Sequence, residues 1–354
     1  MIRSPSTGVS TVGSAMYLGT TLIAAAVLCA ASSASAQSVA EFYAGRQINM
    51  IVGSTPGGGY DTQGRLVAKH LGKHIPGNPT VVVQNMPAAG SLAAANHMFN
   101  VAPKDGSAVA LIQRGMLLVK HWNPSAVRFE LGKFNWLGSI NREVALAVSW
   151  HTAPHRTGRD LFETELIVGA TNGIDPETTP RLLNALIATK FKVITGYPGV
   201  TEIVLAMERG EVQGIGDWSI SSVKVARPDW IREKKINVLM QIALQKAPEF
   251  ADVPFALDFV KTEADRRVME LYLTQKTVAR PMIAPPGVPA DRVAALRTGF
   301  AALAQDKDFL ADAQKAKLDV ALVTADEVDK VIALITAASP ETAERLGQAI
   351  GSQK

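Results

Sequence analysis

Two neighbouring segments of the chain repeat one local pattern, a short apolar run followed by a loop of small residues and then by a helix-like stretch. Residues 48–61 read INMIVGSTPGGGYD, and residues 81–91 read VVVQNMPAAGS. Such runs predict buried strands that lead directly into helices. Two units side by side would place two sets of free backbone N–H groups around one point, which can hold an anion without a positive side chain.

The surrounding sequence predicts that these units belong to an open, mostly parallel sheet. We expect strands at 48–52, 80–84 and 108–113 and helices at 62–74 and 92–99, the order β-α-β-α-β. Asp61 and Ser91 are expected to cap the two helices. Ligands of such sheets bind beyond the carboxyl ends of the strands, where both loops lie.

A second series of the same kind begins near residue 143. We expect its loops at 171–173, 196–199 and 216–219, between strands at 144–149, 166–170, 191–195, 212–215 and 236–241 and helices at 178–190 and 201–209. From residue 248 a Pro-punctuated crossing leads to a strand at 280–284 and to helices at 292–304, 308–317 and 325–338. We expect this helical tail to pack back on the lobe formed by the first series of strands.

The first 36 residues have the layout of a secretory signal. Arg3 gives a positive start, residues 16–30 are apolar, and Ala34, Ser35 and Ala36 form a small-residue cleavage motif. We therefore expect cleavage before Gln37 and a periplasmic location. A lipoprotein is disfavoured because Leu28 is too large to precede a lipidated cysteine. An uncleaved anchor is disfavoured because the apolar run is short for a span of roughly 20 residues.

The composition of the remaining chain excludes several classes of function. About 318 residues remain, which suggests two domains. Cys29 is the only cysteine and lies in the removed segment, so no disulfide, thiolate catalysis or cysteine metal site is expected. Removal of Arg3 from 36 basic and 32 acidic residues leaves a net charge of +3, which does not indicate nucleic acid.

No motif proposes an enzyme, a cofactor or a metal. The glycines at 57–59 lack the Lys-Ser/Thr of a phosphate-binding loop, their spacing is wrong for a dinucleotide, and no nucleophile elbow occurs. His70 and His74 are four residues apart but lack a third ligand, and we expect them on a solvated helix face, as we do His151 and His155.

Three kinds of side chain could nevertheless contact a ligand. Arg114, just after the third strand, could pair with a carboxylate in bidentate fashion or form a surface ion pair. Tyr197, Trp218 and Trp150 could form the wall of a cleft or be edges of the core.

The ordered set of motifs resembles the extracytoplasmic receptors of tripartite tricarboxylate transporters, the TctC/Bug-type family. The motifs are Pro56 to Asp61 with Arg65, VVVQNMPAAG at 81–90, APKDG at 102–106, Tyr197-Pro198-Gly199, Asp252-Val253-Pro254 and APPGVP at 284–289. The resemblance implies an α/β fold, a two-lobed periplasmic-binding-protein-like clamp in which each lobe is a mostly parallel sheet flanked by helices. Lobe 1 would comprise residues 37–142 plus 255–354, and lobe 2 residues 143–254.

The resemblance also implies a function without chemistry. The protein would be a monomer that captures a small organic carboxylate and delivers it to the membrane permease subunits of a tripartite transporter. The alternatives are a sensory ligand-binding subunit and a secreted hydrolase using Asp217 or Asp175 as a base. The predicted ligand-binding residues are Ser54, Thr55, Gly58, Gly59, Asn85, Ala88, Ala89, Gly90, Arg114, Thr171, Asn172, Tyr197, Asp217 and Trp218.

The sequence departs from the family pattern in both lobes. The second loop usually reads Gly-Ala-Gly-Gly and here is Ala88-Ala89-Gly90-Ser91, so that two methyl groups could narrow the pocket. The second-lobe loop at 171–175 carries bulk and an acid, Asp175. An acid in the cleft would favour a ligand with an ammonium group or several hydroxyls opposite its carboxylate.

Overall fold

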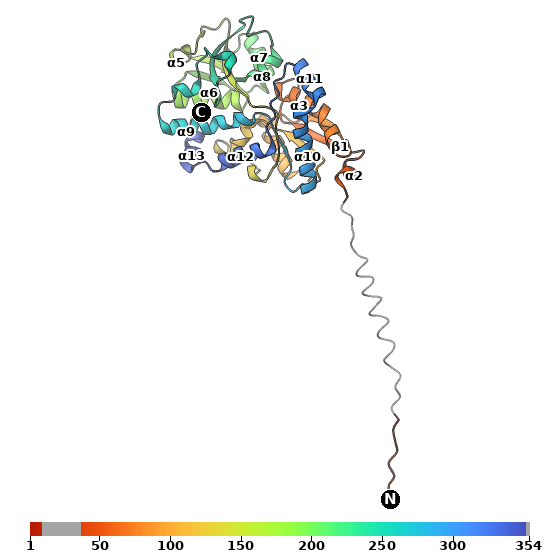
Figure 1. Ribbon diagram of the computed structural model, residues 1–354. Coiled ribbons are helices and arrows are strands. Elements are labelled where there is room, and N and C mark those ends of the chain that lie inside the picture. The colour runs from red at the N-terminus through yellow and green to blue at the C-terminus, as the bar shows by residue number, and fades with distance from the viewer. Residues whose placement is uncertain (9–36, 352–354) are drawn as a thin grey trace. The chain divides into compact units, whose positions relative to one another are not determined.

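Two five-stranded sheets organise residues 39–351 (Figure 1). The computed structural model describes residues 1–8 and 37–351, so the predicted apolar core and cleavage motif of the signal lie outside the described residues. The described residues from Val39 onward belong to one compact unit.

The first sheet is built around the strand that precedes the glycine loop. β1 pairs in parallel with β2 on one side and β3 on the other, as the β-α-β-α-β pattern predicts. β10 runs antiparallel to both β3 and β4, so four strands share one direction and β10 opposes them. In sheet order the strands are β2 (Thr80–Asn85), β1 (Gln47–Val52), β3 (Ala108–Leu111), β10 (Pro281–Ala284) and β4 (Asn135–Ser139).

The second sheet repeats this order. β6 pairs in parallel with β7 and β8, and β5 runs antiparallel to both β8 and β9. Here too one strand, β5, runs opposite to the other four. Like β10, it directly follows a segment in which the chain crosses from one sheet to the other. In sheet order the strands are β7 (Phe191–Ile194), β6 (Leu166–Gly169), β8 (Gly214–Ser219), β5 (Ala145–Trp150) and β9 (Ile236–Ile242).

Helices cover both sheets. Figure 1 places α3, α10 and α11 together at one end of the folded body and α6, α9 and α13 at the other. The helices are α2 (Val39–Tyr43), α3 (Gly59–Leu71), α4 (Leu92–Asn100), α5 (Asp160–Glu163), α6 (Asp175–Ile187), α7 (Val200–Glu208), α8 (Ile220–Ala226), α9 (Glu263–Thr274), α10 (Ala290–Ala302), α11 (Lys307–Lys315), α12 (Ala325–Thr336) and α13 (Pro340–Gly351).

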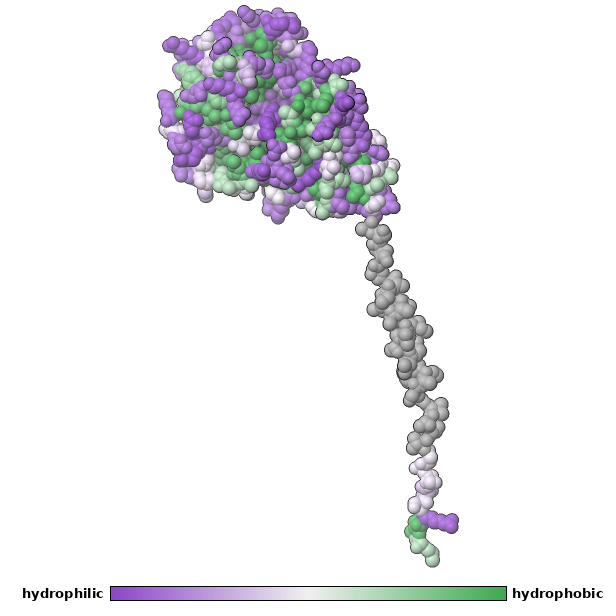
Figure 2. Space-filling model, viewed as in Figure 1, coloured by the Kyte–Doolittle hydropathy of each residue, from purple (hydrophilic) through white to green (hydrophobic). Residues whose placement is uncertain are grey.

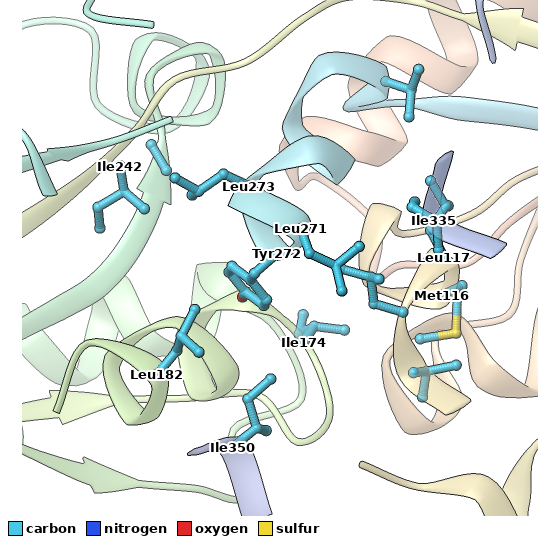
Figure 3. Close-up of a cluster of buried hydrophobic side chains, with 14 of the residues drawn as sticks. Met116, Leu117, Ile174, Leu182, Ile242, Leu271, Tyr272, Leu273, Ile335 and Ile350 are labelled. Atoms are coloured by element: carbon cyan, nitrogen blue, oxygen red, sulfur yellow. The ribbon is translucent and has the colours of Figure 1, made fainter. Parts of the chain in front are cut away.

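One hydrophobic cluster is shared by the two sheets. It contains Ile51 and Ala110 of the first sheet together with Val168 and Leu239 of the second. Figure 3 shows side chains from α6, α9, α12 and α13 and from the segment after β3 gathered in this cluster, with Tyr272 of α9 at its centre. Two further clusters lie on the remaining faces of the sheets, so each sheet is buried on both sides, as expected of largely parallel sheets.

The C-terminal helices pack against both sheets and not only against the first, where the sequence predicted them. α10, α11 and α12 pack against the first sheet and its helices, whereas α13 packs against α6 and α9 beside the second. The lobe boundaries at 142/143 and 254/255 stay a prediction.

Several local expectations were wrong. Residues 216–219 are not a loop but the end of β8, because Trp218 and Ile215 pack into the core on strand β8. The strand expected at 212–215 is therefore β8, which begins at Gly214 and ends at Ser219. The expectations also omitted β4, α2, α5, α8, α9 and α13.

The two expected helix caps act differently. α3 begins at Gly59 and its N-cap is Gly58, so Asp61 lies inside the first turn. Ser91 does occupy the N-cap position of α4, but its side chain makes no capping hydrogen bond. Both side chains instead form hydrogen bonds to the backbone of neighbouring loops.

Two of the four histidines expected on solvated faces, His70 and His155, are buried, and the other two, His74 and His151, are half-buried. His70 is 5 % exposed, and its Nε2 lies 2.8 Å from the Asp312 carboxylate on α11. His74 contacts Asp306 at the same distance. His155 is fully buried, with Nε2 3.0 Å from the Thr164 hydroxyl. Among the described residues, no group of three or more His, Cys, Asp or Glu side chains is placed to hold a metal.

Within residues 1–8 and 37–351 the helices are too short or too polar for any of them to cross a bilayer. On the face of the folded body visible in Figure 2, hydrophilic residues separate the apolar patches.

Candidate functional site

A pocket lies where loops from the two sheets meet. We call it the central pocket, and it lies at the carboxyl ends of β1, β6 and β8, where open α/β sheets bind ligands. Its lining comprises Gly53, Ser54, Thr55, Gly58, Gly59, Tyr60, Pro87, Gly90, Gln113, Arg114, Thr171, Ile174, Asp175, Pro176, Pro198, Gly199, Val200, Thr201, Asp217, Trp218, Ser219, Ser222 and Ala226.

An outer pocket adjoins it and shares several lining residues. It is lined by Thr55, Asn85, Met86, Pro87, Ala88, Ala89, Gly90, Thr171, Asn172, Tyr197 and Pro198, none of which carries a charge.

The glycine loop after β1 is fixed by an internal carboxylate. Asp61 accepts hydrogen bonds from the Gly57 N–H, from the Asn85 amide and from Arg65, at 2.8 to 3.0 Å. Asn85 also donates to the Ser54 carbonyl. Burial opposes ionisation of Asp61, but these hydrogen bonds outweigh it and lower its pKa. Asp61 therefore uses its charge to shape the loop.

The start of α3 faces the pocket without a side-chain cap. Gly58 and Gly59 line the pocket, and Gly58, the N-cap, offers no side chain to the first N–H groups of this 13-residue helix. Helix N-termini carry a partial positive charge and free donors, so this end suits an anion.

The second loop is held in a left-handed conformation. Ala89, Gly90 and Ser91 all have positive φ, at +51°, +60° and +79°. Ser91 donates to the Gly53 carbonyl at 2.6 Å and accepts from the Gln113 N–H at 2.9 Å. A Cβ on Gly53 would lie 1.9 Å from the Ser91 hydroxyl oxygen, so this clamp requires glycine at 53. The serine that departs from the family pattern thus ties together the segments after β1, β2 and β3.

A buried cluster of four charges lies at one wall of the central pocket, and three of its members line the pocket. Arg114, just after β3, contacts Asp175 at the start of α6 and lies 3.4 Å from Asp217 on β8. Lys276 Nζ lies 2.6 Å from Asp217 and 3.5 Å from Asp175. Each of the four side chains is less than one-tenth exposed. Two cations thus offset two carboxylates within one buried cluster.

Hydroxyl groups complete the cluster. Thr179 donates to Asp217 at 2.7 Å, and Tyr272 lies 2.7 Å from both Thr178 and Thr179. Arg114 also donates to Ser219 at 3.1 Å. Burial opposes ionisation of Asp175, yet the Arg114 and Lys276 charges lower its pKa. Burial raises the pKa of Asp217, and the charge of Asp175 adds to that rise although Lys276 opposes it. We take both carboxylates as ionised near neutral pH because each contacts a cation.

A third buried cation, Arg280, braces the crossing between the sheets. The Arg280 guanidinium stacks 3.9 Å from the Tyr60 ring centroid and donates to Ser221 and Ser222. Glu143 lies 3.7 Å from it. The two crossing segments also bond to each other, from Glu143 N–H to the Lys276 carbonyl and from Ala279 N–H to the Asn141 carbonyl.

Glycines allow the loops of the two sheets to touch. A Cβ on Gly59 would lie 2.4 Å from the Ser222 hydroxyl oxygen, and a Cβ on Gly199 would lie 2.5 Å from that of Thr55. A Cβ on Gly90 would meet Ile174 at 2.4 Å. The structure is therefore a closed arrangement in which side chains at these positions would hold the loops apart.

Three buried polar atoms on pocket-lining residues have no hydrogen-bond partner in the described chain. They are Arg114 Nε, Thr171 Oγ1 and Trp218 Nε1. The residues are 3 %, 7 % and 1 % exposed. Unpaired buried polar atoms are rare in native structures, so these three atoms are the candidates on the lining residues to meet polar atoms of a ligand.

The fold is similar to those of several solved periplasmic binding proteins. BugD, a periplasmic binding protein, is 18 % identical with a TM-score of 0.68, covering 87 % of this chain and 98 % of its own. A protein of R. palustris with adipate is 17 % identical with a TM-score of 0.66 (86 % and 97 % covered). MatC of Rhodopseudomonas palustris, with bound malate, is 19 % identical with a TM-score of 0.64 (86 % and 99 % covered).

The chain has the two-lobed fold of the TctC/Bug solute-binding proteins. No protein-family model and no curated protein matches it.

The predicted ligand-binding residues of this Bug-like fold fall around the two adjoining pockets. Nine line the central pocket, namely Ser54, Thr55, Gly58, Gly59, Gly90, Arg114, Thr171, Asp217 and Trp218. Asn85, Ala88, Ala89, Asn172 and Tyr197 line the outer pocket. Trp150 lies away from both and stacks on Trp230 with ring centroids 4.8 Å apart.

Two predicted residues have partners that differ from the expectation. Arg114 is not exposed, and both of its terminal nitrogens already have partners, namely Asp175 and Asp217 at Nη2 and Ser219 at Nη1. The side-chain amide of Asn85 is hydrogen-bonded to Ser54, Asp61 and Arg65, so Asn85 fixes the conformation of the loop.

Sequence reasoning missed Lys276, Arg280, Glu143 and Tyr60. Lys276 and Arg280 lie five and one residues before β10, in a stretch with no motif. The available signal was two basic residues in a segment that crosses between sheets, where burial requires acidic partners.

Proposed function

We propose that this protein is an extracytoplasmic receptor that captures a small organic carboxylate between its two sheets and delivers it to a membrane permease. The observation that carries the proposal is the central pocket, with the uncapped start of α3 on one side and three unpaired buried polar atoms around it. Adipate and malate, found with two proteins of the same fold, set the chemical class to be tried first.

The carboxylate would lie against the first-sheet loops. The first N–H groups of α3 would replace water around its oxygens, together with the backbone at 88–90, while Thr171 and Trp218 contact the rest of the ligand. Backbone hydrogen bonds to a charged group each contribute about 1.5–3 kcal/mol, enough in sum for micromolar binding. The site needs no free cationic side chain for this.

Capture and release need no chemistry at the site, and we propose none. The carboxylates suited to act as a base, Asp175 and Asp217, are held by Arg114 and Lys276. The signal-like first 36 residues support export, and the proposed partner is a membrane permease that meets the closed receptor as a monomer.

Thermal unfolding tests the proposal. A ligand that binds only the folded state stabilises it by about 2.7 kcal/mol at 100 times its Kd, so a panel of mono- and dicarboxylates should contain members that raise Tm and change tryptophan fluorescence. A panel that leaves both signals unchanged would contradict the proposal. As a control, the corresponding primary amides should have no effect.

A further inference from the structure

We propose that the ligand is a monocarboxylate whose far end is neutral and polar, such as a hydroxy acid, rather than a dicarboxylate or an amino acid. This inference rests on the proposed function and specifies its substrate class. It follows from the charges of the pocket wall and from the atoms there that still lack partners.

The charges that line the central pocket belong to Arg114, Asp175 and Asp217 alone among the described residues. The wall therefore carries one cation and two anions, and the second cation, Lys276, lies behind it with its ammonium on the two carboxylates. The outer pocket has no charged residue. A second ligand carboxylate would meet two fixed carboxylates and a guanidinium that they already occupy. Such like-charge contacts oppose binding strongly.

The cluster also disfavours binding of an ammonium group at the far end of the ligand. Asp175 and Asp217 each already contact both Arg114 and Lys276, and Thr179 also donates to Asp217. These bonds would have to break before either acid could accept a new cation. With Lys276 counted, the four-charge cluster is neutral overall, so it offers an ammonium group no carboxylate without a cation partner.

A neutral polar end matches the unpaired atoms. Arg114 Nε and Trp218 Nε1 can only donate, and the Thr171 hydroxyl can donate or accept. A hydroxyl or carbonyl oxygen supplies the acceptor that these atoms lack. It also leaves the four-charge cluster intact.

Matched ligands of one length test the inference. Succinate, 4-hydroxybutyrate and 4-aminobutyrate would be titrated into the purified protein by calorimetry at pH 7, with glutarate, 5-hydroxypentanoate and 5-aminopentanoate as a longer set. In the set that binds, we expect the hydroxy acid to bind at least tenfold more tightly than its dicarboxylate and amino counterparts. Equal or tighter binding of either counterpart overturns the inference and leaves the proposed function standing. Absence of binding by all members and by the wider carboxylate panel overturns both.

A charge change at the wall gives a second measurement. Asp175→Asn leaves Arg114 and Lys276 with one carboxylate, so the wall becomes net positive. The preference for the hydroxy acid over the dicarboxylate should then fall at least tenfold or reverse. The matched control is Asp258→Asn, which removes an exposed carboxylate paired with Lys246 outside both pockets, and it should keep the wild-type preference. An unchanged preference in folded Asp175→Asn overturns the inference. Should that variant not fold, the titrations of the wild-type protein still decide.

Discussion

At the scale of single residues, the site depends on charges that never reach solvent. Lys276 is 1 % exposed, and its ammonium group contacts the Asp175 and Asp217 carboxylates. A buried ion pair contributes little net stability, but removal of one partner leaves an uncompensated charge. Lys276 is thus needed because Asp175 and Asp217 are present, and not for any contact with ligand.

Lys276→Met should therefore destabilise the fold by about 3–5 kcal/mol, because the methionine fills the space but leaves Asp217 with less compensation. Urea unfolding followed by circular dichroism measures the loss. The matched control is Lys246→Met, whose ammonium pairs with Asp258 at the surface and should matter by about 1 kcal/mol or less. Adding Asp217→Asn to Lys276→Met should restore part of the stability. If both lysine variants behaved alike, the buried cluster would not be ionised as described.

Residue by residue, the sequence predicted backbone sites better than side-chain partners. The loops around Gly58, Gly59 and Gly90 follow from local composition, because a strand, small residues and a helix are adjacent in the chain. The two carboxylate partners of Arg114 come from positions 61 and 103 residues away, and no local pattern connects them. Likewise Gly216 and Asp217 are poor strand formers and predict a loop, although the buried position of Trp218 makes this segment the end of β8.

At the scale of elements, the helix that begins at the pocket is anchored at its other end. α3 carries Lys73 and His74 just beyond its last turn, and both contact Asp306, the N-cap of α11. Asp306 also accepts from the Asp308 and Phe309 N–H groups. Burial opposes its ionisation, but the hydrogen bonds from Lys73 and His74 outweigh this and lower its pKa.

This arrangement predicts a pH-dependent contribution to stability. A carboxyl group whose pKa is lower in the folded state stabilises fully above its unfolded value, about 3.9, and loses that contribution as the pH falls through its folded pKa. Asp306→Asn keeps a side-chain oxygen for the helix cap but loses the charge. Its Tm should lie below that of the wild type at pH 7, and the gap should narrow below about pH 4. Asp308→Asn, at an exposed position, should track the wild type throughout. A gap that is constant with pH would show that Asp306 acts through the cap alone.

At the scale of the whole molecule, the shared core and the crossing segments determine which closures are possible. The hydrogen bonds between Glu143 and Lys276 and between Ala279 and Asn141 hold the two crossings together. We therefore expect the sheets to turn about this pair while their loops approach or separate. The approach ends where Gly59 and Gly199 meet Ser222 and Thr55. Closure of two units around a ligand in this way is a common hinge motion.

Gly199→Ala tests the closed arrangement. The backbone at Gly199 is extended, with φ −167°, so alanine adds no strain there, but its methyl group would lie 2.5 Å from the Thr55 hydroxyl. We expect ligand affinity to fall at least tenfold, because the last part of closure is blocked, while Tm without ligand changes little. Small-angle scattering should show a ligand-induced decrease in radius of gyration in the wild type that is smaller in the variant. Gly132→Ala, where nothing lies within 4 Å of the new methyl, is the matched control and should close as the wild type does. Wild-type affinity and compaction in Gly199→Ala would mean that the ligand-bound form does not bring these two loops together.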